Sequence, residues 1–256
     1  MLGQSNDCNP DTPHIWLCHQ SKQVPDSLPD WLTSFERQTL AKLEGPRRGE
    51  YLSSRWLIRQ GLSNISGKPA EQCLPVDGRP VASQFPPGWH LSLSHSRGLN
   101  AVVIGPTPLG IDIEPSQRKP DWQGVAKRWF SPVEQEWLLR ANDPYNFLKV
   151  WTLKEAWLKA TRRGIAGNLQ TLEVRQDFEL YGDQPDCQWR SYCCYVEGFL
   201  ATLVYQSNDP DRETSCPAVT LLEPPPEDYN LAPAEPLDTH LDPLYHRTIR
   251  AKRQTR

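Results

Sequence analysis

The 256-residue sequence lacks several signatures that mark common classes of protein. It contains no Walker-type phosphate loop, no G-x-G-x-x-G fingerprint and no G-x-S-x-G turn, which argues against those nucleotide-binding loops and against a serine hydrolase. Its net charge of −3 at pH 7 provides no overall basic field for nucleic acid. We therefore expect no nucleic-acid partner, and any anion site must be built from local charges.

Cysteine pairs and long apolar runs are also missing. The seven cysteines are an odd number and form no C-x-x-C pair, so neither a disulfide framework nor a zinc site is indicated. Reduced thiols of a cytoplasmic protein are the simpler interpretation. The apolar runs, such as 101–104, are far too short to cross a bilayer, and the polar N-terminus lacks the pattern of a signal peptide. We expect a cytoplasmic protein without a membrane partner.

The sequence does contain the pattern of two similar halves. Helical periodicity is followed by strand-like alternation twice, first over 28–114 and then over 121–205. The segment 98–104 also resembles the segment 198–204, which is weak support for a duplication. We predict an α+β fold that consists of an N-terminal half and a C-terminal half, covering residues 1–107 and 108–206.

The character of the sequence changes after residue 206. Residues 207–256 are rich in proline and in acidic residues, and the last ten residues are basic. Such a segment buries too little apolar surface to offset the entropy that is lost when it becomes ordered. We predict a flexible or loosely attached tail.

The sharpest local signal is the run G-I-D-I-E-P at 110–115. On a strand, Asp112 and Glu114 point to the same side, while the two isoleucines point into the core. Adjacent carboxylates repel each other unless a cation lies between them, and oxygen ligands without His or Cys favour Mg²⁺. The alternative is a solvated strand end with exposed acids, and the run by itself leaves both open.

A predicted helix carries a second pair of charged residues. Asp143 is a helix cap, Pro144 suits the first turn, and Gly164 is expected to end the helix. Glu155 and Lys159 are four residues apart and therefore share a face. The pair is either an ordinary surface ion pair or a third metal carboxylate next to a lysine that binds phosphate.

A third motif, F-S-P-V-E at 130–134, has a structural explanation. Ser131 is a good N-cap, Pro132 suits the first helical position, and Glu134 completes a capping box. This role accounts for Glu134 without any catalysis.

Taken in order, five motifs resemble the 4′-phosphopantetheinyl transferases, in particular the long single-chain type associated with surfactin and enterobactin synthesis. They are G-R-P at 78–80, L-S-H-S at 93–96, G-I-D-I-E at 110–114, F-S-x-x-E at 130–134 and W-T-x-K-E-A-x-x-K at 151–159. The run R-R-G-E-Y-L-x-x-R at 47–55 resembles the enterobactin-associated branch. The resemblance spans about residues 28–205, and the tail has no counterpart in it.

The resemblance implies two halves related by a pseudo-two-fold axis, with the active site in the cleft between them. The implied ligands of Mg²⁺, for which Mn²⁺ is an alternative, are Asp112, Glu114 and Glu155. The implied contacts with coenzyme A, the co-substrate, are Arg48, Arg55, Arg79, Ser94, His95, Lys154 and Lys159. Arg47 and Arg48 cannot be told apart in this comparison. Glu155 is the first candidate for the catalytic base, and Lys159 is the second.

The resemblance further implies an activity. A monomer would transfer the 4′-phosphopantetheine arm from coenzyme A to a serine of an apo acyl or peptidyl carrier protein and would release 3′,5′-ADP. One alternative is another Mg²⁺-dependent nucleotidyl transferase or phosphotransferase that binds a nucleoside triphosphate. A second is a non-enzymatic adaptor for carrier proteins, which would require a damaged site. The basic and aromatic segment 118–130 is either a docking surface for an acidic carrier or an ordinary amphipathic helix.

Overall fold

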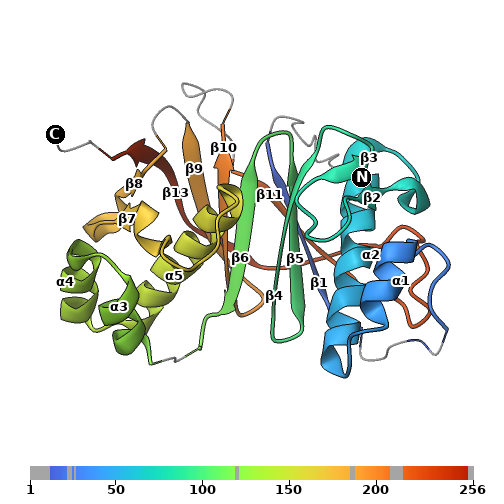
Figure 1. The fold of residues 1–256 in the computed structure, drawn as a ribbon, viewed down its shortest axis with the longest axis horizontal. Coiled ribbons are helices and arrows are strands. Elements are labelled where there is room, and N and C mark those ends of the chain that lie inside the picture. Colours follow the sequence, from blue (N-terminus) through green and yellow to red (C-terminus); the bar gives the residue numbers. More distant parts are fainter. Residues whose placement is uncertain are drawn as a thin grey trace.

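The structure is a computed structural model that describes residues 12–21, 25, 27–118, 121–184, 188–207 and 216–252. Two α+β halves lie side by side in Figure 1, and each has helices packed on its sheet. The predicted α+β class is therefore confirmed, while the pseudo-two-fold relation stays a prediction. Among the described residues, no helix combines the length and the apolar character needed to span a bilayer.

The first half packs two helices, α1 (Ser34–Leu40) and α2 (Pro46–Ser66), against a five-stranded sheet. In spatial order the strands are β12 (Pro236–Leu237), β11 (Ala218–Leu222), β1 (His14–His19), β5 (Leu99–Gly105) and β4 (His90–Ser96). A short turn at Ala70–Gln72 leads into a small separate sheet of β2 (Leu74–Pro75) and β3 (Ser83–Phe85). Helix α2 starts with Pro46 in its first turn and ends at Gly67, which has the left-handed φ of 68° that favours glycine.

The second half is built on a six-stranded sheet. In spatial order its strands are β6 (Leu109–Pro115), β10 (Phe199–Gln206), β9 (Trp189–Val196), β13 (Leu241–Ala251), β8 (Leu180–Gly182) and β7 (Leu172–Val174). Its helices are α3 (Trp122–Trp129), α4 (Pro132–Ala141) and α5 (Pro144–Ala160), with short turns at Leu169–Thr171 and Gln176–Phe178. The predicted capping box is confirmed, because Ser131 and Glu134 each accept the other's backbone N–H at the start of α4.

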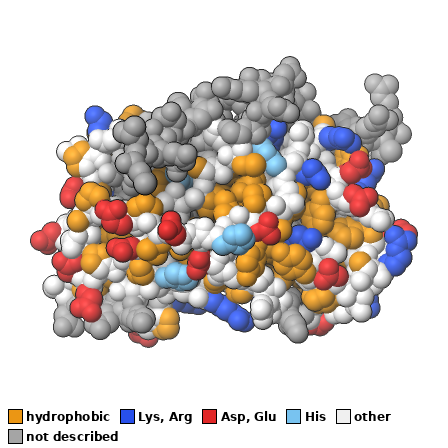
Figure 2. Space-filling model, turned by 180° about the vertical axis from the view of Figure 1, so that it is seen from behind, with side chains coloured by type: hydrophobic (Ala, Val, Ile, Leu, Met, Phe, Trp, Pro, Cys, Tyr) orange, Lys and Arg blue, Asp and Glu red, His pale blue; other side chains and the backbone are white. Residues whose placement is uncertain are grey.

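The halves share a core that contains residues from both sheets. Ile15 and Val103 of the first sheet belong to the same buried cluster as Ile111, Tyr192 and Leu203 of the second. Each half also has its own cluster between its sheet and its helices. Figure 2 shows the face opposite to Figure 1, where acidic, basic and hydrophobic side chains are interspersed, in line with the small net charge.

The described part of the C-terminal segment corrects one prediction. Residues 216–252 are integrated into both sheets, because β11 pairs in parallel with β1 and β13 pairs with both β9 and β8. Between these strands, Tyr229 is fully buried, and its hydroxyl lies 2.9 Å from Ser53 Oγ of α2. The prediction of a flexible tail is therefore wrong for 216–252, whereas 208–215 and 253–256 lie outside the described residues.

Gly110 of β6 explains how α5 comes so close to the sheet. A Cβ atom at this position would collide with backbone atoms of Ala156 and Ala160, so only glycine permits this approach. The close packing brings Glu155 and Lys159 of α5 to the strand that carries the D-x-E motif. One glycine thus sets the distance between the two catalytic candidates and that motif.

Candidate active site

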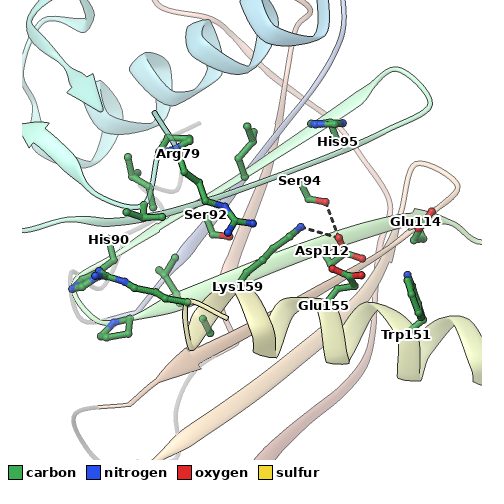
Figure 3. A pocket seen from close by; sticks show the side chains of 18 of the residues that line it. Arg79, His90, Ser92, Ser94, His95, Asp112, Glu114, Trp151, Glu155 and Lys159 are labelled. Atoms are coloured by element: carbon green, nitrogen blue, oxygen red, sulfur yellow. Dashed lines mark hydrogen bonds and ion pairs between the residues drawn. The ribbon is translucent and has the colours of Figure 1, made fainter. Parts of the chain in front are cut away.

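A pocket of about 760 Å³ lies where β4, β6 and the end of α5 meet. Seven predicted site residues line it, as Figure 3 shows for these side chains: Arg79, Ser94, His95, Asp112, Glu114, Glu155 and Lys159. Three other predicted residues lie outside this lining: Arg48, Arg55 and Lys154. The pocket therefore gathers all of the predicted metal carboxylates but only part of the predicted contacts with coenzyme A.

Asp112 is bonded to side chains from both halves of the chain. Its Oδ1 accepts a hydrogen bond from Ser94 Oγ–H at 2.9 Å and lies 2.9 Å from Lys159 Nζ. The same Nζ donates to the carbonyl oxygen of Ile111 at 2.8 Å, which holds Lys159 against β6. Asp112 itself is 8% exposed, so these bonds are partly shielded from water.

Glu114 lies two residues further along β6, on the same side as Asp112. It forms an ion pair with Arg118, four residues later, and its Oε2 accepts a hydrogen bond from Ser96 Oγ–H at 3.4 Å. Burial raises the pKa of Glu114, the charge of Arg118 lowers it, and the neighbouring charge of Asp112 raises it. The two carboxylates therefore repel each other, as the sequence predicts.

Glu155 faces this pair from α5. Its pKa is raised to about 7, mainly by burial and then by the negative charge of Asp112, while Lys159 acts in the opposite direction. Without a further cation, a large fraction of Glu155 is protonated near neutral pH. A carboxylate in this pKa range is suited to exchange a proton with a substrate.

The carboxylates of the pocket form a donor set that suits Mg²⁺ in its chemistry. Carboxylate oxygens are the ligands that Mg²⁺ prefers. Burial, followed by repulsion between the carboxylates, raises the pKa values of Glu114 and Glu155, and a divalent cation would relieve that repulsion. Within the described ranges, however, no three Asp, Glu, His or Cys side chains converge closely enough to form a ready-made metal cluster. Asp112 and Glu114 are instead engaged by Lys159 and Arg118. The three carboxylates therefore fit Mg²⁺ in their chemistry, and two of them, Asp112 and Glu114, are in contact with Lys159 and Arg118 in this structure.

The pocket also contains a cation that the sequence analysis missed. Arg162 lines it next to His90, whose pKa is lowered first by burial and then by the charge of Arg162. Arg162 lies just beyond the end of α5 with a left-handed φ of 56°, so the helical spacing of the motif gave no signal for it. Its neighbour Arg163 instead forms an ion pair with Asp183 at 2.6 Å.

Lys154 lies elsewhere than the resemblance implies. It is fully buried, and its Nζ lies 2.7 Å from Glu134 Oε1 and donates to the carbonyl oxygens of Leu169 and Leu172. Burial lowers the pKa of Lys154, and the charge of Glu134 raises it. Lys154 is therefore a structural residue in this geometry, and Glu134 does more than cap α4. The implied phosphate contact of Lys154 is not supported, because its charge is already neutralised inside the core.

Arg55 and Arg48 are also engaged away from the pocket. Arg55 is buried, lies 3.8 Å from Glu36 and donates to the carbonyl oxygen of Gly78 at 3.2 Å. It thereby supports the turn that presents Arg79. Arg48 donates to the carbonyl oxygen of Leu40. His95 does line the pocket, and its Nδ1 lies 3.2 Å from Oε2 of Glu50.

Comparison with known proteins identifies the family of the chain. Residues 108–204, which include β6 and α5, match the family described as the 4′-phosphopantetheinyl transferase superfamily. The 4′-phosphopantetheinyl transferase psf-1 of Bacillus pumilus is 33% identical over 165 residues, which cover 60% of this chain and 67% of that protein. The 4′-phosphopantetheinyl transferase HetI of Nostoc sp. is 31% identical over 177 residues, which cover 64% of this chain and 74% of that protein.

A third relative, the 4′-phosphopantetheinyl transferase Sfp of Bacillus subtilis, is 30% identical over 127 residues, which cover 48% of this chain and 54% of that protein. The family match contains all three carboxylates of the pocket, and the alignments with psf-1 and HetI, over 165 and 177 residues, extend beyond it. The five motifs, the pocket lined by residues from four of them and these relatives lead to one conclusion: the chain belongs to the 4′-phosphopantetheinyl transferase family.

Proposed function

We propose that this phosphopantetheinyl transferase takes the arm from coenzyme A in an Mg²⁺-dependent reaction and attaches it to a serine of an apo acyl or peptidyl carrier protein. The proposal includes 3′,5′-ADP as the second product. The observation that carries it is one pocket in which the carboxylates of Asp112, Glu114 and Glu155 face the cations of Arg79, Lys159 and Arg162. This combination of charges suits a metal ion bound together with a pyrophosphate, because carboxylates bind the metal and basic side chains bind the phosphate oxygens.

Asp112, Glu114 and Glu155 would hold the metal. The support is that all three line one pocket and that the raised pKa values of Glu114 and Glu155 reflect burial and mutual repulsion. When bound, Mg²⁺ would offset the charge of the pyrophosphate and act as a Lewis acid at the reacting phosphate.

The cations of the pocket would bind the phosphates of coenzyme A. Arg79 is presented by the turn that Arg55 supports, and Lys159 is held at β6 by the carbonyl oxygen of Ile111. Arg162 adds a third charge next to His90. Charge-assisted bonds of this kind are stronger than neutral ones, and they would orient the pyrophosphate toward the attacking hydroxyl.

Proton transfer would fall to α5. The hydroxyl oxygen of the carrier serine forms a bond to the β-phosphorus, the bond between this phosphorus and the bridging oxygen breaks, and the serine proton must go to a base. Glu155 is the first candidate, because its half-buried carboxylate lines the pocket beside Asp112 and Lys159. Lys159 is the second candidate.

The carrier would dock next to Trp151 and Arg118, which line both the main pocket and a small apolar groove of about 120 Å³. Helix α3 borders this groove through Val125 and exposes Trp129, over which Arg128 lies at 5.0 Å from the ring centre. Carriers that are acidic around their serine would complement these groups. Lys119, part of the predicted docking segment, lies outside the described residues.

We further propose that the enzyme acts as a cytoplasmic monomer without nucleic-acid or membrane partners. The described cysteines carry free thiols, which suits a reducing compartment: Cys18, Cys73, Cys193, Cys194 and Cys216.

Intact-mass measurement tests the proposed function. Apo acyl and apo peptidyl carriers are each incubated with the protein, coenzyme A and Mg²⁺, with EDTA in a parallel sample. We expect the mass of one phosphopantetheine group to be added to at least one carrier, and EDTA to prevent it. Carriers of unchanged mass would contradict the proposal, and consumption of a nucleoside triphosphate instead would favour another phosphotransferase.

A further inference from the structure

The two halves meet where β4 and β6 run next to each other, although these strands belong to different sheets. An edge strand leaves a row of backbone groups without ladder partners. Two such N–H groups of β6 donate to serine hydroxyls of β4: Ile111 N–H to Ser92 Oγ at 3.1 Å, and Ile113 N–H to Ser94 Oγ at 3.3 Å. Serine side chains thus replace ladder bonds across this joint.

Ser94 has a second bond on the same hydroxyl. Its Oγ–H donates to Asp112 Oδ1 at 2.9 Å while its oxygen accepts the N–H of Ile113. A serine hydroxyl has a single proton, so in this arrangement Ser94 has no donor left for a phosphate oxygen. Ser94 is only 6% exposed, so water competes little for these bonds.

The pattern extends along both strands. Residues two apart on a strand face the same way, so Ser94 and Ser96 meet Asp112 and Glu114 in matching order. The bond from Ser96 to Glu114 is longer, at 3.4 Å. At Asp112, the bonds from Ser94 and Lys159 both fall on Oδ1 and fix the orientation of the carboxylate. The first half of the chain therefore sets the position of a carboxylate that belongs to the second half.

We propose that Ser94 is a positioning residue for Asp112. Its hydroxyl joins the two halves and fixes the carboxylate through Oδ1, which leaves Oδ2 for the cation. A bond from outside the ligand set that orients a metal ligand typically contributes strongly to metal affinity. This inference rests on the proposed role of Asp112 as an Mg²⁺ ligand.

A comparison of Ser94→Ala with Ser92→Ala tests the inference. Both variants remove a buried hydroxyl that accepts an N–H of β6, so both should lower the melting temperature, Ser94→Ala by more because it also loses the bond to Asp112. Only Ser94→Ala also removes the donor to Asp112. Isothermal titration of the protein with Mg²⁺, without carrier, should show about tenfold weaker binding for Ser94→Ala. Ser92→Ala should bind Mg²⁺ like the wild type, and Ser94→Thr, which keeps the hydroxyl, should restore most of the affinity.

Equal Mg²⁺ affinities in the two alanine variants would overturn the inference. So would Ser94→Ala with unchanged Mg²⁺ affinity and a raised KM for coenzyme A, because Ser94 would then contact the substrate. If Ser94→Ala does not fold, Ser94→Cys, a weaker donor of similar shape, replaces it in the comparison. The activity of the wild type tests the proposed function separately. If the wild type transfers no phosphopantetheine to any carrier, the proposed function is contradicted. If the wild type is active but the two alanine variants bind Mg²⁺ equally well, only the role of Ser94 is contradicted.

Discussion

Removal of one partner from the buried ion pair of Lys154 and Glu134 should strongly destabilise the fold. The two charged atoms are 2.7 Å apart, and both side chains are fully shielded from water. Loss of one partner leaves the other charge buried and uncompensated, which lowers the free energy of unfolding by about 3–5 kcal/mol. In a chain of this size each 1 kcal/mol lowers the melting temperature by about 2–4 °C. Lys154→Met should therefore melt about 6–20 °C below the wild type.

Addition of Glu134→Gln to Lys154→Met should recover much of this loss. Glu134 accepts the backbone N–H groups of Ser131 and Val174, each at 2.8 Å. Gln removes the second charge but keeps one oxygen, which can still accept one of these two hydrogen bonds. We expect a favourable coupling of about 2 kcal/mol or more between the two substitutions. Urea unfolding of the wild type, both single variants and the double variant, followed by circular dichroism, measures it as a double-mutant cycle.

The same variants separate structure from catalysis. Glu134→Gln and Lys154→Met should each keep kcat and the KM for coenzyme A close to wild type when assayed well below their melting temperatures. Lys154→Met with wild-type stability and a strongly raised KM for coenzyme A would refute this reasoning. Lys154 would then contact the substrate, as the resemblance implies.

Three further results are expected. Arg162→Ala should raise the KM for coenzyme A about tenfold, because it removes a charge-assisted phosphate contact. Arg163 forms an ion pair outside the pocket, so Arg163→Ala should leave this KM unchanged. Equal effects of the two substitutions would remove Arg162 from the site. Burial lowers the pKa of His14 to about 4, so the unfolded chain binds a proton that the folded chain does not, and stability is lost as pH falls from about 6.5 toward 4. By pH 5 the free energy of unfolding should have fallen by about 2 kcal/mol because of His14. The urea midpoint of His14→Gln should therefore fall less steeply with decreasing pH than that of the wild type, and an equally steep fall would contradict the prediction. Lys127→Glu with Arg128→Glu should raise the KM for the carrier but not for coenzyme A, and added salt should weaken wild-type carrier binding; equal carrier KM values at low salt would exclude α3 as the docking face.

Local patterns predicted the parts of the site that depend on neighbouring residues. The alternation in 110–115 correctly placed Asp112 and Glu114 on one side of a strand, and the capping box at Ser131 was confirmed. The spacing of Glu155 and Lys159 also put both side chains into the same pocket. Strand and helix periodicity settle these features before any tertiary contact is known.

Features that depend on tertiary packing could not be predicted in this way. Lys154 and Glu155 are consecutive, so their side chains point about 100° apart on the helix, and the motif does not tell which of them faces the pocket. The structure turns Glu155 toward Asp112 and Lys154 toward Glu134. The partner of Ser94 was equally hidden, because it lies on a strand of the other half.

The C-terminal segment could not be predicted for a different reason. Its average composition is polar, and disorder was inferred from that average. A few large side chains at separated positions, such as Tyr229 and Ile249, are nevertheless buried, and the strands β11 and β13 of this segment pair with β1 and β9. A strand that joins a formed sheet makes its backbone hydrogen bonds with a partner strand that is already ordered. Amino-acid composition gives no information about such pairing.

The central claim is that the carboxylates facing the pocket form the catalytic metal site. The most direct test is the rate of phosphopantetheine transfer, followed by intact mass of the carrier, for Asp112→Ala, Glu155→Gln and the wild type. Glu173→Gln, which alters a carboxylate paired with Arg175 outside the pocket, is the matched control. We predict a loss of at least about 10³-fold for the two pocket variants, with folded circular dichroism spectra, and a wild-type rate for the control. A folded Asp112→Ala or Glu155→Gln that retains more than about a tenth of the wild-type rate would contradict the account.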